Sequence, residues 1–96
     1  MSKYSFEFKK YRKGKIIMLN VYEHFYSLDV TDEHKFYCKC INDQYQFDVY
    51  IPYRHNKSVL NFIINENIAT LKEERDEYYG KSYTMILSPK SLLQVV

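Results

Sequence analysis

Two cysteines and three histidines are the side chains of this sequence best suited to holding a metal ion. Cys38 and Cys40 are separated by one residue, and His24, His34 and His55 lie on either side of them in the chain. Thiolate and imidazole are the ligands that zinc prefers, but structural zinc sites use paired clusters such as Cys-x-x-Cys, and the sequence contains none. The two cysteines are expected to be free thiols in a reducing, cytosolic setting. We therefore expect no metal site and no cofactor.

The sequence carries no signature of covalent or acid–base catalysis. It contains no Gly-x-Ser-x-Gly and no His-Glu-x-x-His, and its two glycines leave little backbone for a phosphate-binding loop. We expect no catalytic residues. The remaining enzymatic alternative is metal-independent RNA cleavage by Arg, His and Tyr, as in small bacterial ribonuclease toxins. Those toxins place helices directly after their first strand, whereas this chain begins with a predicted hairpin, so the element order counts against them.

Basic residues gather near the N-terminus. Between Lys3 and Lys15 the chain has six basic residues and one acidic residue. Cations neutralise phosphates, and a tyrosine among them can stack on a base, so single-stranded nucleic acid is the alternative partner. The candidate residues for it are Lys9, Lys10, Tyr11, Arg12, Lys13 and Lys15. The net charge of the chain is only +2, and a solvated, lysine-rich turn is the competing interpretation.

Tyrosine is the most over-represented residue type, with eleven copies among 96 residues and no tryptophan. A chain this short cannot enclose all of its seventeen aromatic side chains, and tyrosine is a preferred anchor at protein interfaces. Five acidic and two basic residues lie between Glu66 and Glu77. Acidic side chains beside tyrosines can imitate nucleic acid, although they can also pair with the basic residues of the same molecule. The predicted partner-binding residues are Tyr50, Tyr53, Arg54, Glu73, Glu74, Asp76, Glu77, Tyr78 and Tyr79.

Residues with AT-rich codons far outnumber those with GC-rich codons, which indicates an AT-rich genome such as that of a phage or mobile element. The predicted function is a small, non-catalytic protein-binding domain that inhibits a host protein by steric occlusion, of the anti-defence or anti-CRISPR kind. The host protein could itself bind nucleic acid, and a homodimer through a tyrosine-rich edge strand is left open. The sequence shows neither a signal peptide nor a membrane span, so we expect a soluble protein of the (host) cytoplasm.

The elements that position these residues follow from the hydrophobic pattern. A length of 96 residues predicts one domain, residues 1–96. Alternation predicts a hairpin of strands 4–9 and 16–22, with the second strand extended to Val30 through a bend near Glu23, and then a polar turn over 31–35. A second hairpin is predicted from strands 36–41 and 45–51 around the turn 42–44.

One main helix is predicted after the second hairpin. Leu60, Ile64, Ile68 and Leu71 recur at helical spacing. The helix is expected to begin after Ser58 as its N-cap and to run to a C-terminal Gly80, with the acidic stretch at its C-terminal end. A last strand over 82–87 and a helical turn opened by Ser88-Pro89 follow. The expected fold is α+β, a curled antiparallel sheet of four to six strands packed on this helix, in the order β-β-(β)-β-β-α-β.

The tyrosines divide into two groups by the same pattern. Three keep step with apolar neighbours and are expected in the core: Tyr4, Tyr45 and Tyr83. Five fall on turns, on polar faces or beside charge clusters and are expected to be exposed: Tyr11, Tyr50, Tyr53, Tyr78 and Tyr79.

Overall fold

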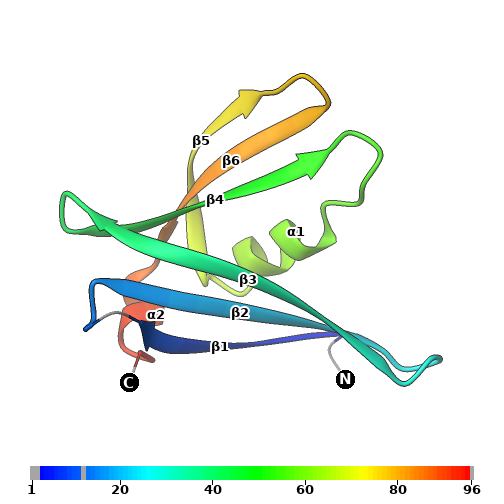
Figure 1. Cartoon of the computed structure of the whole chain (residues 1–96), viewed down its shortest axis with the longest axis horizontal. Coiled ribbons are helices and arrows are strands. Elements are labelled where there is room, and N and C mark those ends of the chain that lie inside the picture. Colours follow the sequence, from blue (N-terminus) through cyan, green and yellow to red (C-terminus); the bar gives the residue numbers. More distant parts are fainter. Residues whose placement is uncertain (1–2, 12, 96) are drawn as a thin grey trace.

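A computed structural model describes residues 3–11 and 13–95 and contains one antiparallel sheet of six strands with two short helices (Figure 1). The spatial order of the strands is β1-β2-β3-β4-β6-β5, so β1 and β5 form the two edges. The elements are β1 (Tyr4–Tyr11), β2 (Ile16–Phe25), β3 (Val30–Ile41), β4 (Gln44–Pro52), α1 (Ser58–Asn65), β5 (Ala69–Asp76), β6 (Gly80–Leu87) and α2 (Pro89–Leu92).

Alternation along the strands gives the sheet one apolar face. The buried side chains of that face come from β2, β3, β4 and β6, with Ala69 from β5, and α1 adds Leu60 and Ile63 from the opposite side. The ring of Phe62 in α1 stacks on Tyr4 at 5.2 Å between centroids and meets Phe6 at 6.0 Å. Helix α1 therefore covers the face of the sheet near β1. The strand residues of the buried core are Ile17, Leu19, Val21, Cys38, Phe47, Val49, Ile51, Ala69, Tyr83, Met85 and Leu87.

The turn between β2 and β3 lies earlier than the sequence indicates. It occupies residues 26–29, with Asp29 at φ 51° and the Leu28 amide donating to the Phe25 carbonyl at 3.0 Å. The expected turn over 31–35 is instead part of β3, and Glu23 pairs in regular register without a bend. The prediction was wrong because β3 is polar on both faces near its start, where most of its side chains are exposed, so its alternation carries little signal.

The second hairpin is confirmed, and the sheet divides beside it. Asn42 and Asp43 form a two-residue turn with φ of 52° and 63°, which matches the right-handed twist of the flanking strands. In the part of the chain that the structure describes, only three residue pairs join β3 to β4, from Ile41–Gln44 to Lys39–Gln46. Beyond these pairs the two strands separate, leaving β1-β2-β3 and β4-β6-β5 as two half-sheets (Figure 1).

The single long helix of the prediction is wrong. Helix α1 has eight residues and ends at Asn65, and Asn67 adopts a left-handed φ of 54° before β5 begins. Asn tolerates this conformation better than other non-glycine residues, and it stops the helix. The acidic stretch therefore lies on edge strand β5, not at a helix C-terminus, and Gly80 opens β6. The helix N-cap is Lys57, without a side-chain cap bond, and not Ser58.

The C-terminal helical turn is confirmed. Ser88 caps α2 by accepting a hydrogen bond from the Ser91 amide at 3.2 Å, with Pro89 at the first helical position. The Ser91 hydroxyl donates to the Ile68 carbonyl at 2.6 Å, and the Ser88 hydroxyl donates to the Asn67 carbonyl at 2.6 Å. These bonds tie α2 to the start of β5. Within the described residues, neither helix is long and apolar enough to cross a membrane.

Candidate interaction surface

Two loops that are distant in sequence meet at one end of the β4-β6-β5 half-sheet. The loop after β4 and the turn between β5 and β6 are joined where the Tyr53 amide donates to the Tyr79 carbonyl at 3.0 Å. Within the turn, the Glu77 amide donates to the Gly80 carbonyl at 2.8 Å. Pro52 pairs with Gly80 in the strand register. The sheet hydrogen bonding therefore fixes the position of both loops.

Gly80 allows this close approach. A side-chain Cβ at this position would lie 2.7 Å from the Pro52 Cα and would collide with the Ile51 carbonyl oxygen. Both are backbone atoms that cannot move aside without shifting β4. The glycine is used here for space and not for an unusual backbone angle, because its φ is outside the left-handed region.

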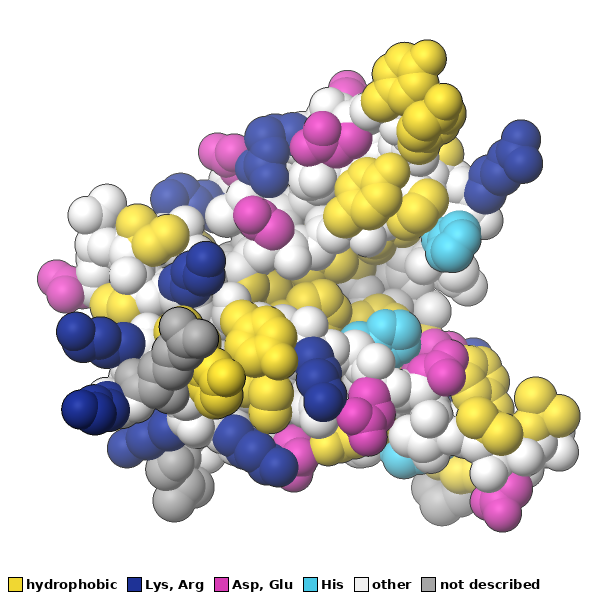
Figure 2. All heavy atoms as spheres, viewed as in Figure 1, with side chains coloured by type: hydrophobic (Ala, Val, Ile, Leu, Met, Phe, Trp, Pro, Cys, Tyr) yellow, Lys and Arg dark blue, Asp and Glu magenta, His cyan; other side chains and the backbone are white. Residues whose placement is uncertain are grey.

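The side chains of the two loops form what we call the tyrosine surface, which consists of Pro52, Tyr53, Arg54, His55, Tyr78 and Tyr79. Its rings are open to solvent, with Tyr53 62%, Tyr78 86% and Tyr79 71% exposed. The rings of Tyr78 and Tyr79 pack edge to face at 4.3 Å between centroids. The six residues line an open hollow of about 470 Å³ whose lining is mostly apolar. Figure 2 shows hydrophobic side chains gathered over this end of the molecule, at the upper right.

The acidic residues of β5 lie beside the tyrosine surface. Lys81 of β6 is 3.6 Å from Glu74 and 3.9 Å from Asp76, and the Tyr53 hydroxyl donates to Asp76 at 3.5 Å. Glu73 pairs with Arg75 on the opposite face of the strand. Among the described residues, the acidic stretch therefore pairs with basic residues of its own hairpin and not with the N-terminal basic residues, which was one expected alternative.

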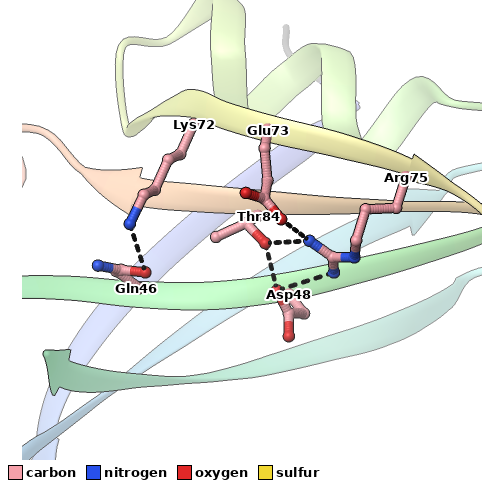
Figure 3. A network of polar contacts seen from close by, with 6 residues as sticks. All are labelled: Gln46, Asp48, Lys72, Glu73, Arg75 and Thr84. Carbon is pink, nitrogen blue, oxygen red and sulfur yellow. Dashed lines mark hydrogen bonds and ion pairs between the residues drawn. The ribbon is translucent and has the colours of Figure 1, made fainter.

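On the outer face of the sheet, Arg75 is the centre of a polar network (Figure 3). Its guanidinium group donates to the Thr84 hydroxyl at 2.8 Å and lies 3.6 Å from Asp48, and Thr84 in turn donates to Asp48 at 2.8 Å. The hydrogen bond to Glu73, followed by the charges of Asp48 and Glu73, raises the pKa of Arg75. The network joins β4, β6 and β5 and holds the acidic edge strand in place.

The structure brings most of the predicted partner-binding residues together. Tyr53, Arg54, Tyr78 and Tyr79 form one surface, and Glu74 and Asp76 lie next to it. Tyr50 is separate: it is 51% exposed on the outer face of β4 and lines the opening toward β3. Sequence reasoning did not assign His55 to this surface, although the residue lies in the loop that it singled out. It also missed Lys81, for which only the pairing of β5 with β6 gives a signal.

No known family model, curated protein or solved structure matches this chain. The candidate site must therefore be judged on its own geometry.

The predicted nucleic-acid residues lie on a different part of the sheet, at the turn between β1 and β2. Lys9, Lys10, Tyr11, Lys13 and Lys15 are exposed there, and Arg12 lies outside the described residues. The tip is fixed by the Tyr45 hydroxyl, which donates to the Gly14 carbonyl at 2.8 Å. Lys39 of β3 pairs with Ile16 and adds a cation that the sequence did not assign to this group.

The cysteines and histidines do not converge on one point. Cys38 is buried, and burial raises the pKa of its thiol to about 12, whereas Cys40 is exposed. His24 contacts the Ser5 hydroxyl at 2.9 Å, and His34 lies 3.5 Å from Glu23. Over residues 3–11 and 13–95, no three His, Cys, Asp or Glu side chains are placed to hold a metal ion.

Proposed function

We propose that this protein is a non-catalytic binding domain that holds a partner protein on the tyrosine surface. The observation that carries the proposal is the junction between Tyr53 and Tyr79, which fixes three highly exposed tyrosines in one place. Tyrosine supplies a large contact area with few rotatable bonds, so ordering it at an interface costs little conformational entropy. Such rings together with an arginine are the residue types that dominate binding energy in protein interfaces.

The chemistry of the surface supports a basic partner. The hollow between the tyrosines has room for an apolar or aromatic side chain of the partner. An arginine or lysine of the partner can lie over the exposed ring of Tyr78 and reach the carboxylates of β5. A partner held in this way would be covered over the area of contact, and its own ligand would be excluded. Inhibition of a host protein by steric occlusion, including one that binds nucleic acid, is therefore the activity we propose.

Paired alanine substitutions test this function. Lysate of the encoding organism or its host is passed over the immobilised protein with nuclease present, and the retained proteins are quantified by mass spectrometry. We expect Tyr53→Ala and Tyr79→Ala each to lower the retention of a specific protein at least tenfold. Tyr11→Ala is the matched control, because it removes an exposed tyrosine at the end of β1, away from the tyrosine surface. Equal retention by all three variants, or retention that depends on nucleic acid, would contradict the proposal.

Single-stranded nucleic acid is the second candidate partner, favoured by one specific observation. The rings of Tyr11 and Tyr37 lie 5.8 Å apart between centroids on the outer face, among the lysines of the β1–β2 turn and Lys39. Paired rings among cations can stack bases while the lysines contact phosphates. Titration of a labelled single strand at several salt concentrations tests this. Binding would weaken steeply as the salt concentration rises. The double variant Lys10→Gln with Lys13→Gln would reduce the slope of the logarithm of the binding constant against the logarithm of the salt concentration.

A further inference from the structure

The opening between the two half-sheets is a groove with a wall on each side, which we call the β3–β4 groove. It contains a hollow of about 220 Å³, lined by Phe36 of β3, Val49 of β4 and Val59 of α1, among others. A second hollow, of about 520 Å³, adjoins the groove at the hairpin end, where its lining runs from Tyr37 and Asp48 to Thr84 of β6 and Arg75 of β5. Figure 2 shows the depression between the upper and lower parts of the molecule.

Free backbone groups line the β3 wall. The His24 amide donates to the Lys3 carbonyl at 2.8 Å. Backbone N–H and C=O groups alternate in direction along a strand, so those of the even-numbered residues of β2 point to β1 and those of the odd-numbered residues point to β3. In the antiparallel register Val21 faces His34, so the even-numbered residues of β3 bond back to β2. The odd-numbered residues direct their N–H and C=O groups to the other side. Lys39 and Ile41 pair there with β4, whereas the groups of Glu33, Lys35 and Tyr37 face the groove.

The β4 wall has the same character. The Tyr53 amide donates to the Tyr79 carbonyl, so the backbone N–H and C=O groups of the odd-numbered residues of β4 point to β6. Those of the even-numbered residues point to the groove. Beyond Lys39–Gln46, no residue pair joins β3 to β4 in the described chain. The backbone groups of Asp48 and Tyr50 therefore face the groove from the other side.

We propose that the β3–β4 groove receives an extended segment of a partner protein, which adds a strand along the free edge of β3. Backbone donors and acceptors recur at every second residue of a strand, about 7 Å apart, and another extended chain is the partner that matches this spacing. The floor of Phe36, Val49 and Val59 favours apolar side chains at alternate positions of the segment. Tyr37 and Tyr50, each about half exposed on the outer face, can contact its outward side chains.

A second copy of this chain does not supply such a segment. The apolar side of edge strand β1 packs on Phe62 of α1, and the other edge strand, β5, carries Glu73 on one face and Glu74 on the other. Near the C-terminus, Val95 packs against the core. The alternating apolar side chains of β1 are thus already packed in their own molecule, and β5 has none to offer in the described chain. The segment therefore belongs to a different protein, and this groove is a binding element separate from the tyrosine surface.

A proline substitution at Lys35 tests the proposal. Proline removes the N–H group of residue 35, which faces the groove, and leaves the bonds from β3 to β2 in place. The probe is a twelve-residue peptide selected on the wild-type protein from a random display library. We expect Lys35→Pro to weaken binding of this peptide at least tenfold and Lys35→Ala to change it less than twofold. Circular dichroism of both variants establishes that they are folded.

Hydrogen exchange of the wild-type protein gives a second readout that does not depend on a variant folding. With saturating peptide, the amides of Lys35, Tyr37 and Asp48 should exchange at least tenfold more slowly. The proposal is overturned if the library yields no binder, if the peptide binds Lys35→Pro as well as wild type, or if protection appears only at the tyrosine surface. A dimer abolished by Lys35→Pro would also overturn it, since the occupant would then be a second copy. Tyr79→Ala should leave peptide binding intact, which separates this test from that of the proposed function.

Discussion

Glu23 is the carboxylate that links the beginning of β1, the middle strands and helix α1. Its oxygens lie 3.2 Å from the Lys3 ammonium group, 3.2 Å from the Tyr4 hydroxyl and 3.5 Å from the His34 ring. The Tyr4 hydroxyl lies in turn 2.6 Å from the Ser58 hydroxyl at the start of α1. These residues are far apart in sequence, which is why no local pattern indicated the cluster.

The ionisation of Glu23 should contribute to stability. Burial raises the pKa of this carboxyl, but hydrogen bonds from Lys3, Tyr4 and His34 outweigh burial and hold the pKa below its ordinary value. A lowered pKa in the folded state gives stability that is present above the unfolded pKa of about 4.3 and is lost as the pH falls through the folded value. We expect Glu23→Gln to lower the free energy of unfolding at pH 7 by about 1–3 kcal/mol.

Urea unfolding of wild type and Glu23→Gln between pH 3 and pH 7 measures this effect. The difference between the two proteins should shrink as the pH falls below about 4.3, because the wild-type carboxylate becomes protonated. A difference that stays constant over this range would show that the carboxylate charge is not responsible.

At the scale of the elements, Gly80 decides whether β4 and the β5–β6 turn can meet. We expect Gly80→Ala to lower the stability by about 1–3 kcal/mol, as other overpacked sites do. The same substitution should weaken partner binding, because Tyr53 and Tyr79 would be pushed apart. Thermal unfolding and the retention assay measure the two effects. Ser82→Ala, two residues along the same strand, is the control, and equal behaviour of the two variants would contradict the packing argument.

The sequence predicted the elements that alternate clearly. Both hairpins, the last strand and the turn after Ser88 appear where the pattern placed them, although β2 and β3 meet at a different turn. Tyr83 is 3% exposed, and Tyr4 and Tyr45 pack against the core, as expected. All five tyrosines expected at the surface are at least 45% exposed. These predictions succeeded because they depend on local alternation of polar and apolar residues.

The helix prediction failed because the spacing of four apolar residues is compatible with one long helix and also with a short helix followed by a strand. Leu60 belongs to α1, but Ile68 is buried just before β5, and Leu71 is a half-exposed residue of that strand. β5 exists because β6 provides a neighbour for it along its whole length, and this tertiary pairing overrides local preference. The convergence of the two tyrosine loops depends on the same pairing and could not be derived from spacing.

At the scale of the whole molecule, charge is distributed unevenly over the sheet. Lysines crowd the β1–β2 turn, whereas Glu73, Glu74 and Asp76 lie on the opposite edge strand, in a molecule 39 Å in its longest dimension. The Debye length is about 10 Å at 0.1 M salt, which is much shorter than the molecule. A charged surface therefore interacts with the charged side chains nearest to it and little with the net charge of the protein. The molecule should therefore dock on charged surfaces in a fixed orientation.

Cation-exchange chromatography tests this orientation. We expect Lys10→Gln with Lys13→Gln to lower the salt concentration needed for elution clearly, because these lysines face the resin. Asp76→Asn with Glu77→Gln changes the net charge by the same amount in the opposite direction and should shift elution much less. Shifts of equal size in opposite directions would show that net charge governs binding.

The division of the sheet also sets the order in which the protein can fold. Strands β1, β2 and β3 are consecutive neighbours, so their pairing closes only short loops, and the loop-closure entropy is small. Strand β4 has three pairs with β3 and must wait for β6, beyond α1 and β5, to complete its hydrogen bonds. During synthesis we therefore expect the first half-sheet to assemble before α1 can cover its apolar face. Phe6, Leu19 and Val21 would be exposed over that interval, which would make them the residues that a chaperone meets first.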